Sequence, residues 1–388
     1  MSTTSASALP VIPIASVELF GKMPSGEAVH KVCLQSKSRD GKLCGASVIT
    51  RGATVQAVNV PDSSGNVEDI ALGFDELAGY TGPTNFCYGG TPGRYANRIS
   101  KGEFKLESED VKVTANWAGA SGTKHCLHGG AAGWDSKIWK ISKGPWIDED
   151  GAHVTMTYES PDKDEGFPGE LRADVTYSWL TNAETMESEL KIVWEATSTR
   201  ATVCNMTNHS YFNLKGVKTA CQVLDTHTVT LNCGKWTEVN EDAIPSGKLL
   251  DVDGTCMDFR SPKLVGKDIS SAQGGGYDHN FVVADWSDAK MKAGEKIFVG
   301  KVEEATSGRV MDCYATQPGV QFFTMQPASV FNKSTTGKYG QTYPVHGGLC
   351  LETQHFPDSP NHAEFPSTLL SPSAPYRQIC WYKFSVKK

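Results

Sequence analysis

Several stretches of this chain alternate between apolar and polar side chains with a period of two residues. Residues 153–160 read HVTMTYES, in which Val154, Met156 and Tyr158 share one side and threonines share the other. Three further stretches, 174–181, 187–199 and 224–232, have the same alternation and are rich in β-branched and aromatic residues. Successive side chains of a strand point to opposite faces of a sheet, so each stretch predicts a strand.

Between these stretches lie clusters of Gly, Pro, Asn and Asp, which are typical of turns. The clusters are residues 61–66, 80–85, 160–170 and 272–278. Only residues 267–273 favour a turn or two of helix, and residues 286–296 form a polar surface segment. We therefore predict an all-β fold, a large antiparallel β-sandwich with few short helices. Turn spacing alone leaves a barrel or a propeller open.

The organisation of the chain indicates one main unit. Residues 1–15 begin with a Ser/Thr-rich stretch and include two prolines, so we expect a flexible lead-in. Residues 16–388 contain no repeat, low-complexity block or linker-like change of composition, which predicts a single β-sandwich domain. The chain is 39% hydrophobic and 21% charged, values expected of a globular protein in water.

Charge and cysteine content narrow the partners and the compartment. The net charge of −7 argues against a nucleic-acid partner, because phosphates need a basic face. No run of about 18 or more apolar residues occurs, so we expect no membrane partner. The 11 cysteines include no C-x-x-C pair, and the first residues lack the basic start of a signal peptide. We expect reduced thiols and a cytoplasmic location.

Five polar segments are unusual for plain β-sheet because each places titratable side chains beside glycines or aromatic residues. They are 89–104 (GGTPGRYANRISKGEF), 125–139 (HCLHGGAAGWDSKIW), 205–214 (NMTNHSYFNL), 274–283 (GGGYDHNFVV) and 347–366 (GGLCLETQHFPDSPNHAEFP). In the third, His209 lies among Asn, Thr, Tyr and Phe. Taken alone, this pattern is compatible with a buried structural histidine or with one that transfers protons to a ligand.

Together the segments resemble the signatures of the aldose 1-epimerase family, also called galactose or hexose mutarotases, nearly from end to end. The matching stretches are GRYANRI (93–99), LHGG followed by GWD (127–135), TNHSYFNL (207–214), YDHNF (277–281), PGVQFFT (318–324) and LETQHFPDSPNH (351–362). The resemblance implies a β-sandwich of large twisted antiparallel sheets with a sugar bound in an open cleft on one of them. It implies interconversion of the α and β anomers of free aldohexoses such as galactose and glucose.

The resemblance also implies roles for seven residues. His209 corresponds to the general acid and Glu352 to the general base. The substrate-binding positions correspond to Asn97, Arg98, His128, Asp278 and Gln321. Ring opening takes a proton from the C1 hydroxyl and gives one to the ring oxygen, tasks that suit a carboxylate and a histidine. The reaction needs no cofactor and no metal, so we expect neither.

Other candidate features have weaker support. His125 and His128 are three residues apart, but a zinc site would need further ligands from elsewhere, so they do not predict a metal site. Trp134 is a candidate apolar wall for the sugar ring. Residues 380–384 (CWYKF) favour a core strand. The expected partner is a small monosaccharide substrate, and the expected assembly is a monomer or weak dimer.

Three alternatives remain open. A hexose-6-phosphate 1-epimerase would need a cationic pocket, for which Arg94, Arg98 and Lys101 are candidates. A non-catalytic sugar-binding protein would not need both an acid and a base. A glycosidase would need two carboxylates, such as Asp278 and Glu352, and would leave His209 without a task.

Three segments depart from the family pattern. Residues 114–126 are longer than the usual connection, residues 284–306 form a longer hairpin region, and residues 371–384 replace the common proline-glycine-glutamate turn. None contains a predicted catalytic or substrate-binding residue, so they bear on substrate preference rather than on reaction type.

Overall fold

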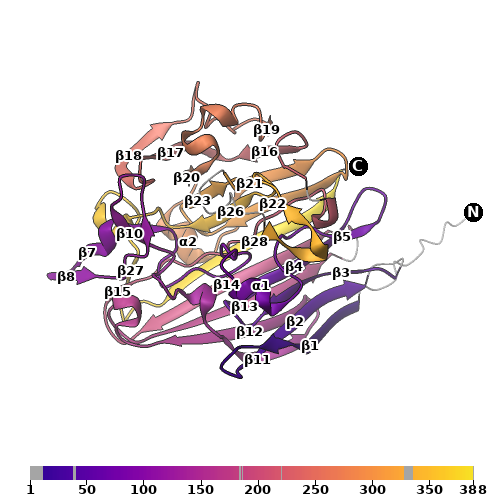
Figure 1. The fold of residues 1–388 in the computed structure, drawn as a ribbon, viewed down its shortest axis with the longest axis horizontal. Helices are drawn as coiled ribbons and strands as arrows, with labels where there is room; N and C mark the ends of the chain where they lie inside the picture. The colour runs from indigo at the N-terminus through magenta and orange to yellow at the C-terminus, as the bar shows by residue number, and fades with distance from the viewer. Residues whose placement is uncertain are drawn as a thin grey trace, which may run out of the picture.

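Antiparallel strands are the main secondary structure of the computed structural model (Figure 1). The structure describes residues 12–37, 41–182, 185, 187–219, 221–326 and 335–387. Within these ranges it contains one nine-stranded sheet, two five-stranded sheets and four smaller ones. The prediction of an all-β antiparallel fold is confirmed.

The nine-stranded sheet has the order β11-β12-β13-β14-β28-β22-β21-β16-β19, and all its neighbouring strands are antiparallel. Its strands are β11 (Lys140–Ile147), β12 (Gly151–Ser160), β13 (Leu171–Thr181), β14 (Ser188–Ser198), β16 (His227–Leu231), β19 (Lys263–Leu264), β21 (Ile297–Glu304), β22 (Arg309–Ala315) and β28 (Tyr376–Val386). The four alternating stretches lie in β12, β13, β14 and β16, and the predicted core strand 380–384 lies in β28. Burial explains the alternation, because Val154 and Met156 of β12 are fully buried.

The N-terminal sheet has the order β1-β2-β3-β4-β5. Its strands are β1 (Ile12–Lys22), β2 (Ala28–Lys37), β3 (Leu43–Ile49), β4 (Thr54–Pro61) and β5 (Val67–Asp69). Strand β1 pairs with β2 from Ile12 onward. Residues 12–15 of the expected lead-in therefore belong to a strand, and residues 1–11 lie outside the described residues.

The second five-stranded sheet carries the candidate site. It has the order β18-β17-β20-β23-β26. The strands are β17 (Cys233–Val239), β18 (Pro245–Asp251), β20 (Asp278–Val283), β23 (Gly319–Phe323) and β26 (Cys350–Gln354). One face of β23 and β26 enters the main hydrophobic core through Val320, Phe322 and Leu351. The hydroxyl of Tyr382 in β28 donates to the carbonyl of Leu351 at 2.7 Å, which joins this sheet to the nine-stranded sheet.

Short strands and turns complete the described structure. The remaining strands are β6 (Arg98–Ile99), β7 (Glu103–Leu106), β8 (Glu109–Lys112), β9 (Trp117–Ala118), β10 (Lys124–Leu127), β15 (Thr202–Val203), β24 (Thr335–Thr336), β25 (Thr342–Tyr343) and β27 (Leu369–Leu370). They form the sheets β6-β10-β9, β7-β8, β15-β27 and β24-β25.

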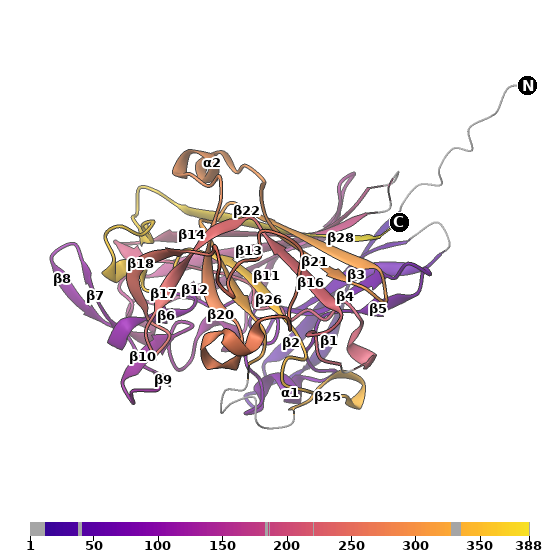
Figure 2. The ribbon, with the colours of Figure 1, turned by 90° about the horizontal axis from the view of Figure 1, so that it is seen from above.

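Helices are few and short among the residues that the structure describes. The α-helices are α1 (Leu77–Thr81) and α2 (Asp288–Ala293), and α2 projects from the body of the protein (Figure 2). The 3₁₀ turns are η1 (Ser100–Gly102), η2 (Trp134–Ser136), η3 (Asp164–Gly166), η4 (Val217–Thr219), η5 (Ile269–Ser271), η6 (Gln273–Gly275), η7 (Lys338–Gly340) and η8 (Ser359–Asn361). The predicted turns in 267–273 correspond to η5 and the start of η6, and segment 286–296 contains α2. In the described part of the chain, no helix has the length and hydrophobicity needed to span a bilayer.

Candidate active site

Polar side chains line the face of β20, β23 and β26 that points away from the core. The register pairs Gln321 with Glu352 and Cys350 with Phe323 on neighbouring strands. It also pairs Asp278 with Phe323. Residues two apart on a strand share a face, so Cys350 and Glu352 lie on the same side of β26, opposite Leu351. The strand register therefore gathers Asp278, Gln321 and Glu352.

His209 approaches this face from the connection between β15 and η4. Its backbone N–H donates to the carbonyl of Gly90 at 2.9 Å, and its carbonyl accepts from the N–H of Gly89 at 2.9 Å. The side-chain amide of Asn208 also donates to the carbonyl of Gly89, at 2.8 Å. The imidazole is stacked on the ring of Tyr211, with centroids 4.8 Å apart and an interplanar angle of 17°. The polar and aromatic neighbours of His209 therefore fix its position.

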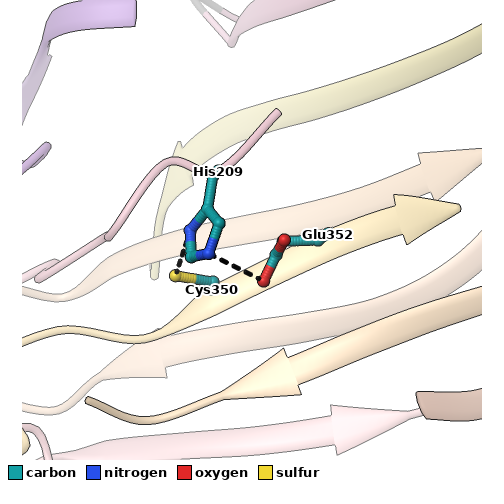
Figure 3. Close-up of side chains that lie close together, drawn as sticks. All are labelled: His209, Cys350 and Glu352. Atoms are coloured by element: carbon teal, nitrogen blue, oxygen red, sulfur yellow. Dashed lines mark hydrogen bonds and ion pairs between the residues drawn. The ribbon is translucent and has the colours of Figure 1, made fainter. Parts of the chain in front are cut away.

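The two nitrogens of the His209 ring have different neighbours, as Figure 3 shows. Nε2 lies 3.6 Å from Oε1 of Glu352, and Nδ1 lies 3.6 Å from Sγ of Cys350. The second carboxyl oxygen of Glu352, Oε2, is buried and has no hydrogen-bond partner among the described residues. A buried polar atom without a partner is costly, so this oxygen is suited to meet a ligand.

Burial shifts both members of this pair toward their neutral forms. It raises the pKa of Glu352 well above the usual range, and the nearby Asp278 adds to the effect. It lowers the pKa of His209 to about 4. Both shifts favour the neutral form of each side chain in the free protein, with the titratable proton on the carboxyl group.

Asp278 is the centre of a second polar group. Nη2 of Arg98 donates to Oδ2 of Asp278 at 3.1 Å, and Nε2 of Gln321 donates to Oδ1 at 2.6 Å. Nη1 of Arg98 donates to Oδ1 of Asn97 at 3.3 Å. Burial by itself raises the pKa of Asp278, but the guanidinium of Arg98 and the amide of Gln321 hold it below the usual value. These groups can exchange hydrogen bonds with sugar hydroxyls.

Asn97 and His128 hold each other in place. Both have left-handed backbones, with φ of 61° and 52°. The backbone N–H of Asn97 donates to Nδ1 of His128 at 3.1 Å, and the carbonyl of Asn97 accepts from the N–H of His128 at 3.0 Å. Burial holds the pKa of His128 well below its usual value. The neutral ring therefore carries its proton on Nε2, and its centroid lies 5.3 Å from that of His209.

All seven residues singled out from the sequence thus lie in one region of the structure. Contacts link His209 to Glu352 and His128, and link Asp278 to Arg98 and Gln321. Cys350 and Phe323, which share the face of the sheet with Glu352, were not among the residues predicted from the sequence. The alternation in CLETQ (350–354) was the signal that could have identified Cys350.

The prediction that Trp134 forms an apolar wall for the sugar ring is wrong. Its side chain is 1% exposed and packs in the core against Trp139 and Tyr158, and the absence of a side chain at Gly93 leaves room for the indole. A different tryptophan borders the site. The ring of Trp117 in β9 lies 4.6 Å from the guanidinium carbon of Arg98 and is only partly buried.

One group of side chains has the composition of a metal site. The candidate ligand atoms of His209, Cys350 and Glu352 lie within 4.8 Å of one another. In the present structure Cys350 and Glu352 contact different nitrogens of the His209 ring. His125 and His128, which the sequence did not predict to be a metal pair, have separate partners: Nε2 of His125 lies 3.3 Å from Asp242, and Nδ1 of His128 accepts from Asn97.

The cationic cluster considered for a phosphorylated sugar is divided between two environments. Arg94 is 1% exposed, and its guanidinium donates to the carbonyls of Pro168 and Gly169, each at 2.8 Å, and to Oγ of Ser160. Its charge is therefore engaged inside the protein. Arg98 alone of the three candidates contacts the polar group around Asp278, since Lys101 is exposed.

Fold and site together define a class: an antiparallel β-sandwich whose sheet face carries a buried imidazole–carboxyl pair beside a group of hydrogen-bonding side chains. Comparison with known proteins gives the family. The aldose 1-epimerase family model matches residues 36–383. The human galactose mutarotase is 39% identical over 95% of this chain and 98% of its own, and the aldose 1-epimerase of Escherichia coli K12 is 32% identical over 86% and 90%. The chain belongs to the aldose 1-epimerase family.

Solved structures agree on the fold. The galactose 1-epimerase from Lactobacillus acidophilus superimposes with a TM-score of 0.76, at 22% identity over 97% of this chain and 100% of its own. The GalM/aldose epimerase homologue from C. elegans has a TM-score of 0.75, at 25% identity over 89% and 96%.

Proposed function

We propose that the protein is an aldose 1-epimerase that interconverts the α and β anomers of free aldohexoses such as galactose and glucose. The observation that carries this proposal is the contact between Nε2 of His209 and Oε1 of Glu352 at 3.6 Å, on a sheet face with hydroxyl-binding groups. Family membership and the names of the relatives support the same reaction.

In this mechanism Glu352 is the general base and His209 is the general acid. The carboxylate takes the proton of the C1 hydroxyl, and the imidazolium gives a proton to the ring oxygen as the bond from C1 to that oxygen breaks. The product is an open-chain aldehyde. Rotation about C1–C2 presents the other face of the carbonyl, and the two protons then return as the ring closes.

The proton distribution of the free protein differs from the one that this step requires. Burial favours the proton on Glu352, whereas ring opening needs a carboxylate and an imidazolium. A C1 hydroxyl that donates to the carboxylate stabilises its charged form, as does a ring oxygen that accepts from the imidazolium. We propose that the bound sugar thereby moves the proton from Glu352 to His209.

The five other residues hold the sugar. Arg98, Asp278 and Gln321 form hydrogen bonds with one another and can extend them to hydroxyls of the bound ring. Nε2–H of His128, beside the His209 ring, is a further donor. Asn97 orients both Arg98 and His128, through its side-chain oxygen and its backbone.

A free sugar is favoured over a 6-phosphate because Arg94 is engaged inside the protein. A glycosidase is disfavoured because Asp278 is engaged by Arg98 and Gln321. We also propose a cytoplasmic location, a monomer or weak dimer as the assembly, and a single domain over residues 16–388. The family implies a small sugar as the partner.

Polarimetry tests the proposal directly. Freshly dissolved α-D-galactose, α-D-glucose and glucose 6-phosphate are followed to their equilibrium rotation with and without protein. We expect catalytic acceleration for the two free sugars and a much smaller effect on the phosphate. If the protein binds galactose in calorimetry but does not accelerate its mutarotation, the protein is a binding module and the proposal is wrong.

The variant Glu352→Gln tests the role assignment. It keeps the size of the side chain and removes the base, so kcat should fall by about 10²–10⁴-fold, the usual contribution of such a group. The dissociation constant for galactose should change much less. The control is Glu303→Gln, in β21 of the nine-stranded sheet, which should keep the activity of the unmodified protein.

A further inference from the structure

The nitrogen of His209 that faces away from Glu352 has a specific neighbour. Sγ of Cys350 lies 3.6 Å from Nδ1, a distance at which sulfur takes part in hydrogen bonds (Figure 3). Cys350 is fully buried, two residues before Glu352 on the same face of β26. One strand therefore places a thiol at one ring nitrogen and a carboxyl group at the other.

The mechanism requires a particular arrangement of protons on His209. Nε2 faces Glu352, so it is the nitrogen that must lose and regain a proton in each turnover. An imidazole that has lost its Nε2 proton is neutral only if Nδ1 keeps its own. A group that accepts a hydrogen bond from Nδ1–H stabilises that tautomer and stabilises the imidazolium even more, because the hydrogen bond is then charge-assisted.

The sulfur of Cys350 is suited to this task because it stays uncharged. Burial holds the pKa of the thiol well above its usual value, and the nearby Glu352 adds to the shift. A thiolate at this place would trap the imidazolium as an ion pair, whereas a neutral, polarizable sulfur is a weak acceptor that lets the ring change its charge.

We infer that Cys350 is a positioning residue of the acid–base pair, whose sulfur accepts a hydrogen bond from Nδ1–H of His209 and so keeps Nε2 as the nitrogen that carries the transferred proton. This inference rests on the proposed function. It adds a residue to which the sequence resemblance assigned no role. A hydrogen bond with the backbone of His209 itself also favours the imidazolium, because it raises the pKa of the ring.

The opposite arrangement makes a different, observable prediction. If the thiol donated its S–H to Nδ1, the neutral ring would carry its proton on Nε2, and that nitrogen could not accept one. The two tautomers have distinct ¹⁵N chemical shifts. Long-range ¹H–¹⁵N spectra of protein labelled in its histidines therefore distinguish them, and the His209→Asn variant identifies the resonances of His209.

We expect Nδ1 of His209 to be protonated and Nε2 to be bare at neutral pH in the unmodified protein. A proton on Nε2 overturns the inference, whatever the activity. Because this measurement needs neither substrate nor turnover, its failure is separate from a failure of the proposed function, which the polarimetric assay reports.

Variants give the second test. Cys350→Ala removes the acceptor, so kcat for galactose should fall about five- to tenfold, which corresponds to the free energy of one ordinary hydrogen bond. KM should change much less. Cys350→Ser keeps an acceptor on a shorter side chain and should regain part of the lost kcat. Cys233→Ala makes the same truncation at a buried position of β17 and should keep kcat.

The outcomes separate positioning from packing. An alanine variant with unchanged kcat overturns the inference. Equal losses in Cys350→Ala and Cys350→Ser, with the unmodified tautomer retained in both, would assign the thiol to packing and also overturn it. If Cys350→Ala does not fold, the inference is tested by the tautomer of His209 in the unmodified protein and by the kcat of Cys350→Ser.

Discussion

His209 reaches Glu352 from outside the sheet, and its Nε2 lies 3.6 Å from an oxygen of a carboxyl group on β26. Both side chains are buried, the imidazole at 8% exposure and the carboxyl group at 2%. Two ionisable groups this close in a poorly hydrated place titrate as a unit. The state with one proton on the pair contains one acid and one base, and it is therefore the active state of the proposed mechanism.

This pairing predicts an unusual pH profile. Below a pH of about 4 the imidazole gains a proton while the carboxyl group keeps its own, so the pair contains no base. Above the raised pKa of Glu352 the pair loses its only proton, so it contains no acid. The plot of kcat/KM against pH, corrected for the uncatalysed reaction, should therefore have an acid limb near pH 4 and a wide plateau.

An acid limb near the ordinary histidine value of 6.5 would contradict this expectation. The residual activity of Glu352→Gln serves as the control. The amide does not titrate, so the alkaline limb due to Glu352 should be absent from that variant.

Arg98→Lys should weaken sugar binding. Lysine keeps the charge, but it cannot donate to Asn97 and Asp278 at once from a planar group, nor stack in the same way on Trp117. A hydrogen bond of a charged group contributes about 1.5–3 kcal/mol, so kcat/KM for galactose should fall about 10–100-fold, mostly through KM. Polarimetry at several galactose concentrations measures both constants.

The matched control is Arg200→Lys, an exposed arginine paired with Glu109, which should leave both constants unchanged. A loss in kcat with a constant KM would show that Arg98 acts on the transition state rather than on the bound sugar.

Strands of the nine-stranded sheet were predictable because one of their faces is buried. Val154 and Met156 alternate with half-exposed or polar neighbours, and the sequence carries that period directly. Strand β1 lacks this signal. Its pattern contains no buried residue, and Val17 and Leu19 are 42% and 57% exposed, so nothing in residues 12–15 separates a strand from a lead-in.

The candidate residues were found through motifs, but their mutual contacts depend on strand register. Gln321 and Glu352 face each other because β23 and β26 pair at that position, and a shift of one residue would turn Glu352 into the core. Cys350 was overlooked for the same reason, since its contact with Nδ1 of His209 joins two distant segments. Trp134 and Trp117 could not be told apart by local sequence, because burial depends on the surrounding fold.

Asp242→Ala should make the β9–β10 hairpin, which lies within the long segment 114–126, more mobile. The carboxylate of Asp242 accepts from the backbone N–H of Ser121 at 2.7 Å and from its hydroxyl at 2.5 Å. It thereby closes the β9–β10 hairpin that carries Trp117 against Arg98. Without these hydrogen bonds and the contact with Nε2 of His125, KM for galactose should rise about three- to tenfold, as if the bound sugar lost one ordinary hydrogen bond, while kcat stays nearly constant.

Polarimetry gives KM for this variant, and limited proteolysis should show faster cleavage within residues 114–126. The control is Asp253→Ala, which removes an exposed partner of Arg260. An unchanged KM together with faster cleavage would show that the hairpin is mobile without affecting the sugar.

Lys338→Met should strongly destabilise the fold. Nζ of Lys338 donates to Oδ2 of Asp69 at 2.6 Å and to the carbonyl of Ala71 at 2.7 Å, and the two side chains are 1% and 2% exposed. Removal of the lysine leaves a buried carboxylate without its counter-charge, which costs about 3–5 kcal/mol of the free energy of unfolding. Urea denaturation with linear extrapolation measures the loss.

The double variant Lys338→Met/Asp69→Asn should recover part of that loss. The amide oxygen can still accept from the backbone N–H of Val58 and Ala71, both at 3.0 Å from Oδ1 of Asp69, without carrying a charge. Lys112→Met, which breaks an exposed ion pair with Glu103, is the control and should leave the urea midpoint nearly unchanged. If Lys338→Met is no less stable than this control, burial of the pair does not contribute to stability.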